Sequence, residues 1–271
     1  MKKIIMFLLS ICLTQSLFYV EKIRNYSDTI QFVKNLNSNF TVTEAGRIEY
    51  TNESYPVYKI TYNPEGNTKT KKYLIISGVH GNEPAPVYAV RDFIISLNNT
   101  GIKRKDLQLD FIVVVNPYGF EFNQRYNGNN LDINRDLISL KTQESKLLTK
   151  CFNPKEYDRV FDFHEANAEG FFLYCYGIKN VKISDRILEE LKKNKVVFDN
   201  KYKDKILKVN NGKLYVPWYA SLYMKKNKTV TNGIYYSVCK NSFTFETSKN
   251  IKMEERKRII TIILNYIIEN V

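Results

Sequence analysis

The stretch Lys72-Tyr-Leu-Ile-Ile-Ser-Gly-Val-His80-Gly-Asn-Glu83-Pro84 decides the fold of this chain. Its apolar run Tyr73–Val79 has the length and the Ile-rich composition of a buried strand, and a Ser-Gly pair marks its end. Proline fits the first position of a helix, where its missing N–H costs no hydrogen bond, so a helix is predicted over Pro84–Leu97. His80 and Glu83 then lie in a loop at the carboxyl end of a strand, where open α/β sheets bind their ligands.

A second histidine strengthens this interpretation. A His and a Glu three residues apart are common by chance, and alone they also fit a solvated loop. The chain has only two histidines, however, and His164 ends another β-like run, Arg159–Ala166. Both imidazoles can therefore point into one crevice. The imidazole of His80 and the carboxylate of Glu83 could then make two of the three protein bonds that a catalytic zinc needs, leaving a position for water.

Length and composition indicate one large domain. The chain has 271 residues, 44% of them hydrophobic, and shows no internal repeat, low-complexity tract or glycine-rich linker. Its formal net charge is +13, from 41 Lys and Arg against 28 Asp and Glu. The lysines are scattered, without an arginine-rich stripe or an aromatic and basic RNA motif, so no nucleic-acid partner is expected. Attraction to an anionic surface or an acidic substrate stays open.

The N-terminus is typical of a secretory signal peptide. Two lysines precede a short apolar run and then small residues, so residues 1–16 are expected to be removed, leaving an exported domain over residues 17–271. The run is too short for a comfortable membrane span, although an uncleaved anchor or a buried helix remains the alternative. Ile11 is too bulky for a lipidation motif at Cys12. We therefore expect a periplasmic or extracellular protein without a stable membrane span.

The remaining cysteines do not form a paired pattern. Cys151, Cys175 and Cys239 lack the spacing of a disulfide scaffold or of a cysteine-based zinc site. One disulfide is possible, but buried apolar thiols are the favoured interpretation.

The rest of the pattern predicts a single α/β domain with a mixed, mostly parallel central sheet and helices on both faces. The region from residue 198 to residue 240 is predicted to be irregular. The expected strands are Phe40–Tyr50, Tyr55–Tyr62, Leu107–Val115, Gly170–Tyr176 and Ser242–Thr247, and the expected helices are Val20–Asn39, Gln143–Cys151, Ser184–Lys195 and Met253–Ile268.

Two further features of the sequence indicate a functional site. The segment Asn116–Asp136 is long and polar and follows a strand, which is typical of a functional loop. Glu246 lies in the apolar strand Ser242–Thr247, where a carboxylate is costly unless it has a partner or a task.

Together these motifs resemble the zinc carboxypeptidase superfamily, in its smaller bacterial branch. The resemblance rests on His80-Gly-Asn-Glu83, on the loop from Asn116-Pro-Tyr-Gly to Asp132-Ile-Asn-Arg135, on Asp162-Phe-His164 and on Glu246. It covers the chain from about Tyr73 to the C-terminus. Deacylases of the succinylglutamate desuccinylase and aspartoacylase type share part of the pattern.

The resemblance implies a role for each residue of the zinc site. His80, Glu83 and His164 would bind one zinc ion per chain, and Asp132 would hydrogen-bond the first histidine, although a turn aspartate is the alternative. Glu246 would be the general base. Its rival Glu165 follows His164 directly, so strand alternation aims it away from the metal.

It also implies the groups that bind the substrate. Arg125 would stabilise the oxyanion of the tetrahedral intermediate, unless it is a surface arginine. Asn134 and Arg135 would hold the substrate's terminal carboxylate. Tyr235 and Tyr236 both fit the position of the family's mobile tyrosine, and no motif decides between them.

The expected function is that of an exported zinc carboxypeptidase. It would hydrolyse an amide bond next to a free C-terminal carboxylate, in peptidoglycan stem peptides (muropeptides) or in scavenged peptides. An N-acyl amino acid deacylase and a zinc-less peptide-binding relative are the alternatives. The carboxylate of Glu246 favours catalysis over binding alone.

Overall fold

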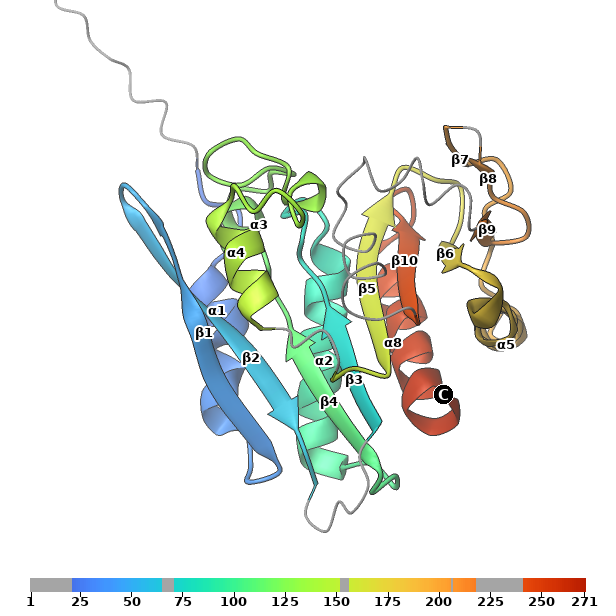
Figure 1. Cartoon of the computed structure of the whole chain (residues 1–271), viewed down its shortest axis with the longest axis horizontal. Helices are drawn as coiled ribbons and strands as arrows, with labels where there is room; N and C mark the ends of the chain where they lie inside the picture. The colour runs from blue at the N-terminus through green and yellow to red at the C-terminus, as the bar shows by residue number, and fades with distance from the viewer. Residues whose placement is uncertain (1–20, 65–70, 152–155, 206, 218–240) are drawn as a thin grey trace, which may run out of the picture.

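Strand β3 (Lys71–Ile76) lies near the middle of the sheet on which the domain is built (Figure 1). The computed structural model describes residues 21–64, 71–151, 156–205, 207–217 and 241–271. In this part of the chain one sheet has eight strands, in the order β1, β2, β4, β3, β5, β10, β6, β9. The other seven strands are β1 (Phe40–Tyr50), β2 (Glu53–Tyr62), β4 (Leu107–Ile112), β5 (Arg159–Ala166), β6 (Phe172–Tyr176), β9 (Lys213–Val216) and β10 (Ser242–Ser248).

The centre of the sheet is parallel and its edges are mixed. Strands β4, β3, β5 and β10 run parallel, and β6 pairs with β9 in the same way. The pairs β1–β2, β2–β4 and β10–β6 are antiparallel. The expected mixed, mostly parallel sheet is therefore confirmed. One correction applies to the region expected to be irregular, because Lys213–Val216 forms β9 and a small hairpin pairs β7 (Lys203–Asp204) with β8 (Leu207–Lys208).

Strand β3 ends three residues earlier than predicted, and this earlier end creates the loop that carries His80. The Ser77 hydroxyl donates a hydrogen bond to the Val113 carbonyl at 2.6 Å. Gly78 then has φ +66°, and a Cβ there would lie 2.9 Å from a methyl group of Val87. The turn therefore requires glycine at this position. It turns the chain out of the sheet directly before His80.

Two long helices cover one face of the sheet. Helices α2 (Pro84–Thr100) and α8 (Met253–Asn270) pack against each other behind the sheet in Figure 1, and α4 (Gln143–Lys150) lies in front of it beside β1. The shorter elements are α1 (Tyr26–Ile30), α3 (Pro117–Glu121), α5 (Val181–Lys193) and the 3₁₀ helices η1 (Gln31–Asn35), η2 (Ile133–Arg135) and η3 (Ile178–Asn180). The described helices thus lie on both faces, as the sequence predicts.

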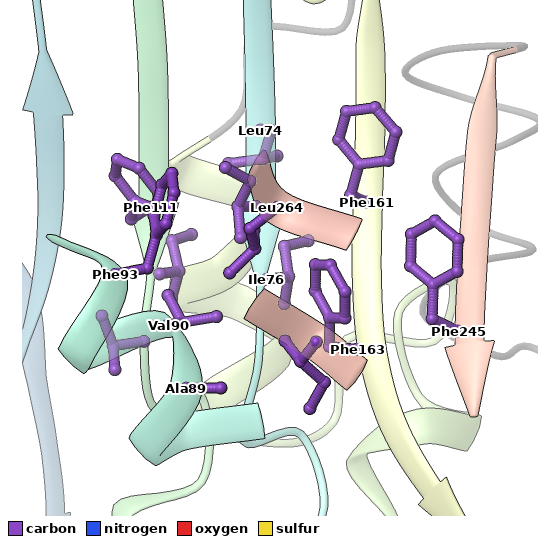
Figure 2. Close-up of a cluster of buried hydrophobic side chains, with 14 of the residues drawn as sticks. Leu74, Ile76, Ala89, Val90, Phe93, Phe111, Phe161, Phe163, Phe245 and Leu264 are labelled. Atoms are coloured by element: carbon purple, nitrogen blue, oxygen red, sulfur yellow. The ribbon is translucent and has the colours of Figure 1, made fainter. Parts of the chain in front are cut away.

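The core lies between the sheet and this pair of helices. Figure 2 shows Phe161 and Phe163 of β5 and Phe245 of β10 beside residues of α2 and α8. All three rings are buried, and each buried phenylalanine contributes about 1.5–3 kcal/mol. Because side chains alternate along a strand, the intervening residues Asp162, His164 and Glu246 face the opposite side. This alternation places polar chemistry on one face and the main core on the other.

Some expectations need correction or lie outside the described residues. The helix predicted over Val20–Asn39 is wrong in length, because only α1 and η1 form there; the Asn25 side chain caps α1 by accepting from the Asp28 N–H. Cys151 and Cys175 are buried free thiols, as favoured. Within the described ranges, none of the helices combines the length and hydropathy needed to cross a bilayer. The predicted signal peptide, Cys12, Tyr235, Tyr236 and Cys239 lie outside the described residues.

Candidate metal centre and active site

His80, Glu83 and His164 come together as a buried cluster that can hold a metal ion. His80 lies in the loop after β3, Glu83 directly precedes α2, and His164 lies on β5. Their side-chain ligand atoms all lie within 4.8 Å of one another, and no residue of the three is more than 3% exposed. The Glu83 carboxylate lies between the two rings, 2.8 Å from His80 Nδ1 and 2.9 Å from His164 Nδ1. The structure thus brings together the three predicted ligands.

The far side of each ring faces an aspartate, which fits a metal site. His80 Nε2 lies 3.4 Å from Asp132 Oδ1, and His164 Nε2 lies 3.1 Å from Asp162 Oδ2. A carboxylate at Nε2 favours the tautomer with its hydrogen on Nε2, which leaves the Nδ1 lone pair for a metal. Both Nδ1 atoms point toward Glu83, so the two histidines and the carboxylate have the arrangement that a divalent cation needs.

The charges in this cluster are strongly coupled. Burial alone would lower the pKa of His164, but the carboxylates of Asp162 and Glu83 raise it well above its usual value. Burial alone would raise the pKa of Glu83, but His80 and His164 hold it well below its usual range. The protein without a metal therefore stabilises an imidazolium on His164 beside the Glu83 carboxylate.

Glu246 lies beside the metal cluster on the polar face of the sheet. The parallel register pairs Glu246 on β10 with His164 on β5, so both side chains leave the sheet on the same side. Burial raises the pKa of Glu246 to about 8, against the opposing charges of His164 and Lys249. A carboxyl group with such a pKa is suited to take up and release protons near neutral pH.

Glu165, the rival base, points to the other side of the sheet. Its carboxylate accepts a hydrogen bond from the Ala85 N–H at 3.1 Å and forms an ion pair with Arg256 of α8. Both partners belong to the helical layer. The alternation argument that favoured Glu246 over Glu165 therefore agrees with the observed contacts.

Arg125 reaches the metal cluster through Asp132. Its Nη2 and Nε atoms donate to Asp132 Oδ2 at 3.0 and 3.2 Å, and its Nη1 lies 3.8 Å from Glu83 Oε1. Burial opposes ionisation of Asp132, but His80, Arg125 and Arg135 hold the pKa of Asp132 well below its usual value. Arg125 thus contacts the metal cluster with a side chain that is 34% exposed. Its pairing with Asp132 was not foreseen.

Asn134 and Arg135 line the same cavity. Both belong to η2, which begins where the Asp132 side chain accepts a hydrogen bond from the Asn134 N–H at 2.9 Å. The cavity has a volume of about 310 Å³. It is bounded by His80, Glu83, Arg125, Asn134, Arg135, Ala166, Asn167, Tyr174, Tyr176, Tyr202, Asp204, Thr244, Glu246 and Lys249, and by Glu165, whose carboxylate nevertheless contacts Ala85 and Arg256 of the helical layer.

A close contact between two glycines fixes the His80 loop against α3, the short helix that follows β4. A Cβ on Gly81 would lie 1.8 Å from the carbonyl carbon of Gly119, so the two backbones touch. Arg24 bridges the His80 loop and α3, because its Nη1 donates to the Phe120 carbonyl at 2.9 Å and to the Gly81 carbonyl at 3.4 Å. This packing holds His80 in place.

Several residues of the cavity were missed by sequence reasoning. Tyr174 and Tyr176 of β6 lie on the same face as Glu246, and strand alternation could have indicated this once their register was known. Asp162 could have been found by its position two residues before His164. Lys249 Nζ lies 3.6 Å from Glu83 Oε1, and Asp204 and Tyr202 come from the segment expected to be irregular.

Comparison with known proteins shows which of them are similar to this chain in sequence. A family model described as a protein of unknown function (DUF2817) matches residues 51–172. A protein from Prochlorococcus marinus assigned as an aspartoacylase is 32% identical over 118 residues, which is 40% of this chain and 38% of that relative. This sequence match therefore spans well under half of the curated relative.

Solved structures match over most of the chain. A protein from Shewanella denitrificans assigned as a metallopeptidase superposes with a TM-score of 0.69 at 16% identity, covering 90% of this chain and 88% of that one. The metallo-carboxypeptidase from Burkholderia cenocepacia gives 0.65 at 17% identity, covering 90% of this chain and 67% of that one. The chain has the metallo-carboxypeptidase fold. The resemblance inferred from the sequence is thus confirmed at the level of the fold. The candidate metal ligands lie at the carboxyl ends of β3 and β5.

Proposed function

We propose that this metallo-carboxypeptidase-like protein is a zinc-dependent carboxypeptidase that hydrolyses an amide bond next to a free C-terminal carboxylate. The observation that carries the proposal is the pairing of Glu246 with His164 in the register of β10 and β5. It puts a carboxyl group with a raised pKa directly beside a buried His-Glu-His cluster. A binding protein has no use for such a group at that position.

The ligand set fits zinc. Two imidazole nitrogens and one carboxylate are the ligands of catalytic zinc sites, which keep a further position open. A zinc ion held by His80, Glu83 and His164 would polarise the scissile carbonyl and make a water molecule more acidic. We propose one zinc ion per chain.

Glu246 transfers a proton from the attacking water to the leaving amine. Its carboxylate accepts a proton from the attacking water, whose oxygen forms a bond to the carbonyl carbon. The same carboxyl group then passes the proton to the amide nitrogen as the carbon–nitrogen bond breaks. One water is consumed, and one carboxylate and one amine are released. Asp132 and Asp162 keep the two histidines in the required orientation.

The cationic side chains of the cavity bind the substrate. Arg125 donates to the carbonyl oxygen as negative charge develops on it, which is where a fixed cation accelerates the reaction most. Asn134 and Arg135 bind the terminal carboxylate. The substrates we propose are peptides or muropeptides, encountered after export to the periplasm or the exterior, with peptidoglycan stem peptides first; we propose no nucleic-acid partner.

A second candidate is an N-acyl amino acid deacylase. The sequence match to the Prochlorococcus marinus protein assigned as an aspartoacylase favours it. Both reactions need the same metal and the same base, so the substrate distinguishes them. Release of acetate from N-acetylaspartate, with no cleavage of peptides, would select the deacylase.

The test combines metal analysis with one variant. The purified chain is loaded with zinc and analysed for metal content, and wild type and Glu246→Gln are incubated with peptides and muropeptides and read by mass spectrometry. We expect one zinc per chain in both proteins and loss of a C-terminal residue with wild type only. The control Glu165→Gln removes the neighbouring carboxylate that faces the helices, and it should retain turnover.

Three results would contradict the proposal. Turnover by Glu246→Gln would remove Glu246 from its role. A protein that binds no zinc and cleaves nothing would favour the zinc-less binding relative. Full zinc occupancy in His164→Ala would refute the proposed ligand set.

A further inference from the structure

The cavity contains charged and aromatic groups that the proposed reaction does not use. Asp204 lines the cavity together with Tyr174 and Tyr202, on the side of Glu246 away from β5. None of the three binds the metal cluster or takes part in the proton transfers described above. A cavity wall with one carboxylate and several tyrosine rings has a definite chemistry of its own.

The local fold aims Asp204 inward. It is the second residue of the two-residue strand β7, and its neighbours Lys203 and Lys205 are exposed. The turn after β7 gives Lys205 a φ of +55°, which directs the chain back into β8. In a segment rich in lysine, the one acidic residue of this hairpin therefore faces the cavity while the lysines face solvent.

Tyr174 contacts the Asp204 carboxylate, and neighbouring rings pack beside it. The Tyr174 hydroxyl donates to Asp204 Oδ2 at 3.3 Å. The Tyr202 ring stacks on Phe172 at 4.5 Å, and Tyr174 stacks on Tyr176 at 6.1 Å. Phe172, Tyr174 and Tyr176 belong to a small apolar cluster on this face of the sheet, which packs against Tyr202. The wall is thus built on packed strands.

The wall adjoins the position where bond cleavage would occur. Tyr202 and Asp204 line the same cavity as Glu246. Tyr174 is paired across β6 and β10 with Thr244, two residues before Glu246. A group bound at Asp204 therefore belongs to the part of the substrate that is next to the scissile bond.

We propose that Asp204, Tyr174 and Tyr202 form a subsite for a cationic side chain, an ammonium or a guanidinium, on the residue that hydrolysis releases. A carboxylate attracts such a cation directly, and tyrosine faces attract it through their π-electrons. The volume of about 310 Å³ holds a single residue, whose carboxylate binds at Asn134 and Arg135 and whose side chain then reaches this wall. This inference rests on the proposed carboxypeptidase function and names its substrate class.

The experiment uses two peptides of nearly equal shape. Benzoylglycyl-lysine and benzoylglycyl-norleucine differ by the ammonium group, and their hydrolysis by the zinc-loaded full chain is compared through kcat/KM. We expect wild type to prefer the lysine peptide about ten- to hundredfold, the range of one charge-assisted contact. In Asp204→Asn this ratio should fall toward one. Asparagine keeps an acceptor for the Tyr174 hydroxyl, so the hairpin keeps its contact.

A matched variant controls for general electrostatics. Glu169 is an exposed carboxylate outside the cavity that pairs with Lys201 of the neighbouring loop. Glu169→Gln removes the same charge and should keep the preference for lysine. An equal loss of the preference in both variants would overturn the subsite, as would a wild type that cleaves both peptides equally well. If the enzyme instead preferred peptides with lysine on the acyl side of the scissile bond, the subsite could not bind the side chain of the released residue.

A binding measurement tests this inference independently of the proposed function. Calorimetry of both peptides with the zinc-loaded Glu246→Gln protein needs no turnover. If no peptide is cleaved by wild type, but the lysine peptide binds more tightly than the norleucine peptide in an Asp204-dependent way, the subsite stands and the proposed function fails. If both peptides are cleaved without preference, the proposed function stands and the subsite fails.

Discussion

Loading the metal-free protein with zinc at pH 7 should release more than one proton per chain. The pKa of His164 is well above its usual value, because Asp162 and Glu83 outweigh its burial, so its imidazole is protonated at pH 7. Metal ligation requires the neutral imidazole, and this proton must leave. Burial raises the pKa of Glu246 to about 8, so most of this carboxyl is also protonated at pH 7.

Zinc changes the charge beside Glu246. A divalent ion replaces the single charge of the His164 imidazolium, which adds one positive charge to the cluster. One unit charge several ångströms away stabilises a carboxylate by about 2 to 3 kcal/mol at an effective dielectric constant of about 20. This lowers the pKa of Glu246 by about 1.5 to 2, so most of the carboxyl ionises at pH 7. We expect about 1.5 to 2 protons released from wild type and about one from Glu246→Gln.

Calorimetry counts these protons. Zinc is titrated into the protein at pH 7 in buffers with different ionisation enthalpies, and the slope of the observed enthalpy gives the number of protons. Zinc affinity should rise with pH, because each released proton opposes binding at low pH. At pH 9 the metal-free Glu246 is already ionised, so wild type and Glu246→Gln should approach the same count. Equal counts at pH 7 would refute the placement of a protonated Glu246 beside the metal.

Three further variants test the surroundings of the metal. Asp132→Asn removes the carboxylate at His80 Nε2 and should weaken zinc binding about ten- to hundredfold in a chelator competition; unchanged affinity would show that Asp132 does not support the ligand. Glu165→Gln breaks the buried pair with Arg256 and should lower the free energy of unfolding in urea by about 2 kcal/mol, while zinc stays bound; loss of zinc would mean that Glu165 faces the metal after all. Gly81→Ala pushes the His80 loop away from α3, which should lower the free energy of unfolding by about 1–3 kcal/mol and weaken zinc binding; a variant with normal zinc affinity would show that this contact does not position His80.

Much of the metal site could be predicted because its signals are local. His80 and His164 follow or end apolar runs with the composition of strands, and strands that run parallel end at the same edge of a sheet. The choice between Glu165 and Glu246 needed only the two-residue period of a strand. The observed contacts of Glu165 with the helical layer and the register of Glu246 with His164 agree with that choice.

The missed features depend on contacts between distant segments. Asp204 belongs to a strand of two residues, which forms only because β8 pairs with it, and no periodicity can appear over so short a length. Arg125 was predicted to act on the substrate, but its ion pair with Asp132 requires the fold of the loop between them. The helix expected over Val20–Asn39 is replaced by α1, which Asn25 caps, and by the 3₁₀ helix η1, after which the chain is extended at Leu36.

The charges around the two histidines explain why this cluster suits a divalent ion. Four carboxylates surround the rings, those of Glu83, Asp132, Asp162 and Glu246. Among the described residues, two cations lie within 4 Å of this group: Arg125 beside Asp132 and Glu83, and Lys249 beside Glu83. Four negative charges against two positive ones leave two negative charges unbalanced. Without a metal, two protons balance them, one on His164 and one on Glu246, which are the groups whose pKa values are raised. A divalent ion supplies the same two charges, so its binding must displace those protons, and the ionised Glu246 that results is the form that a general base requires.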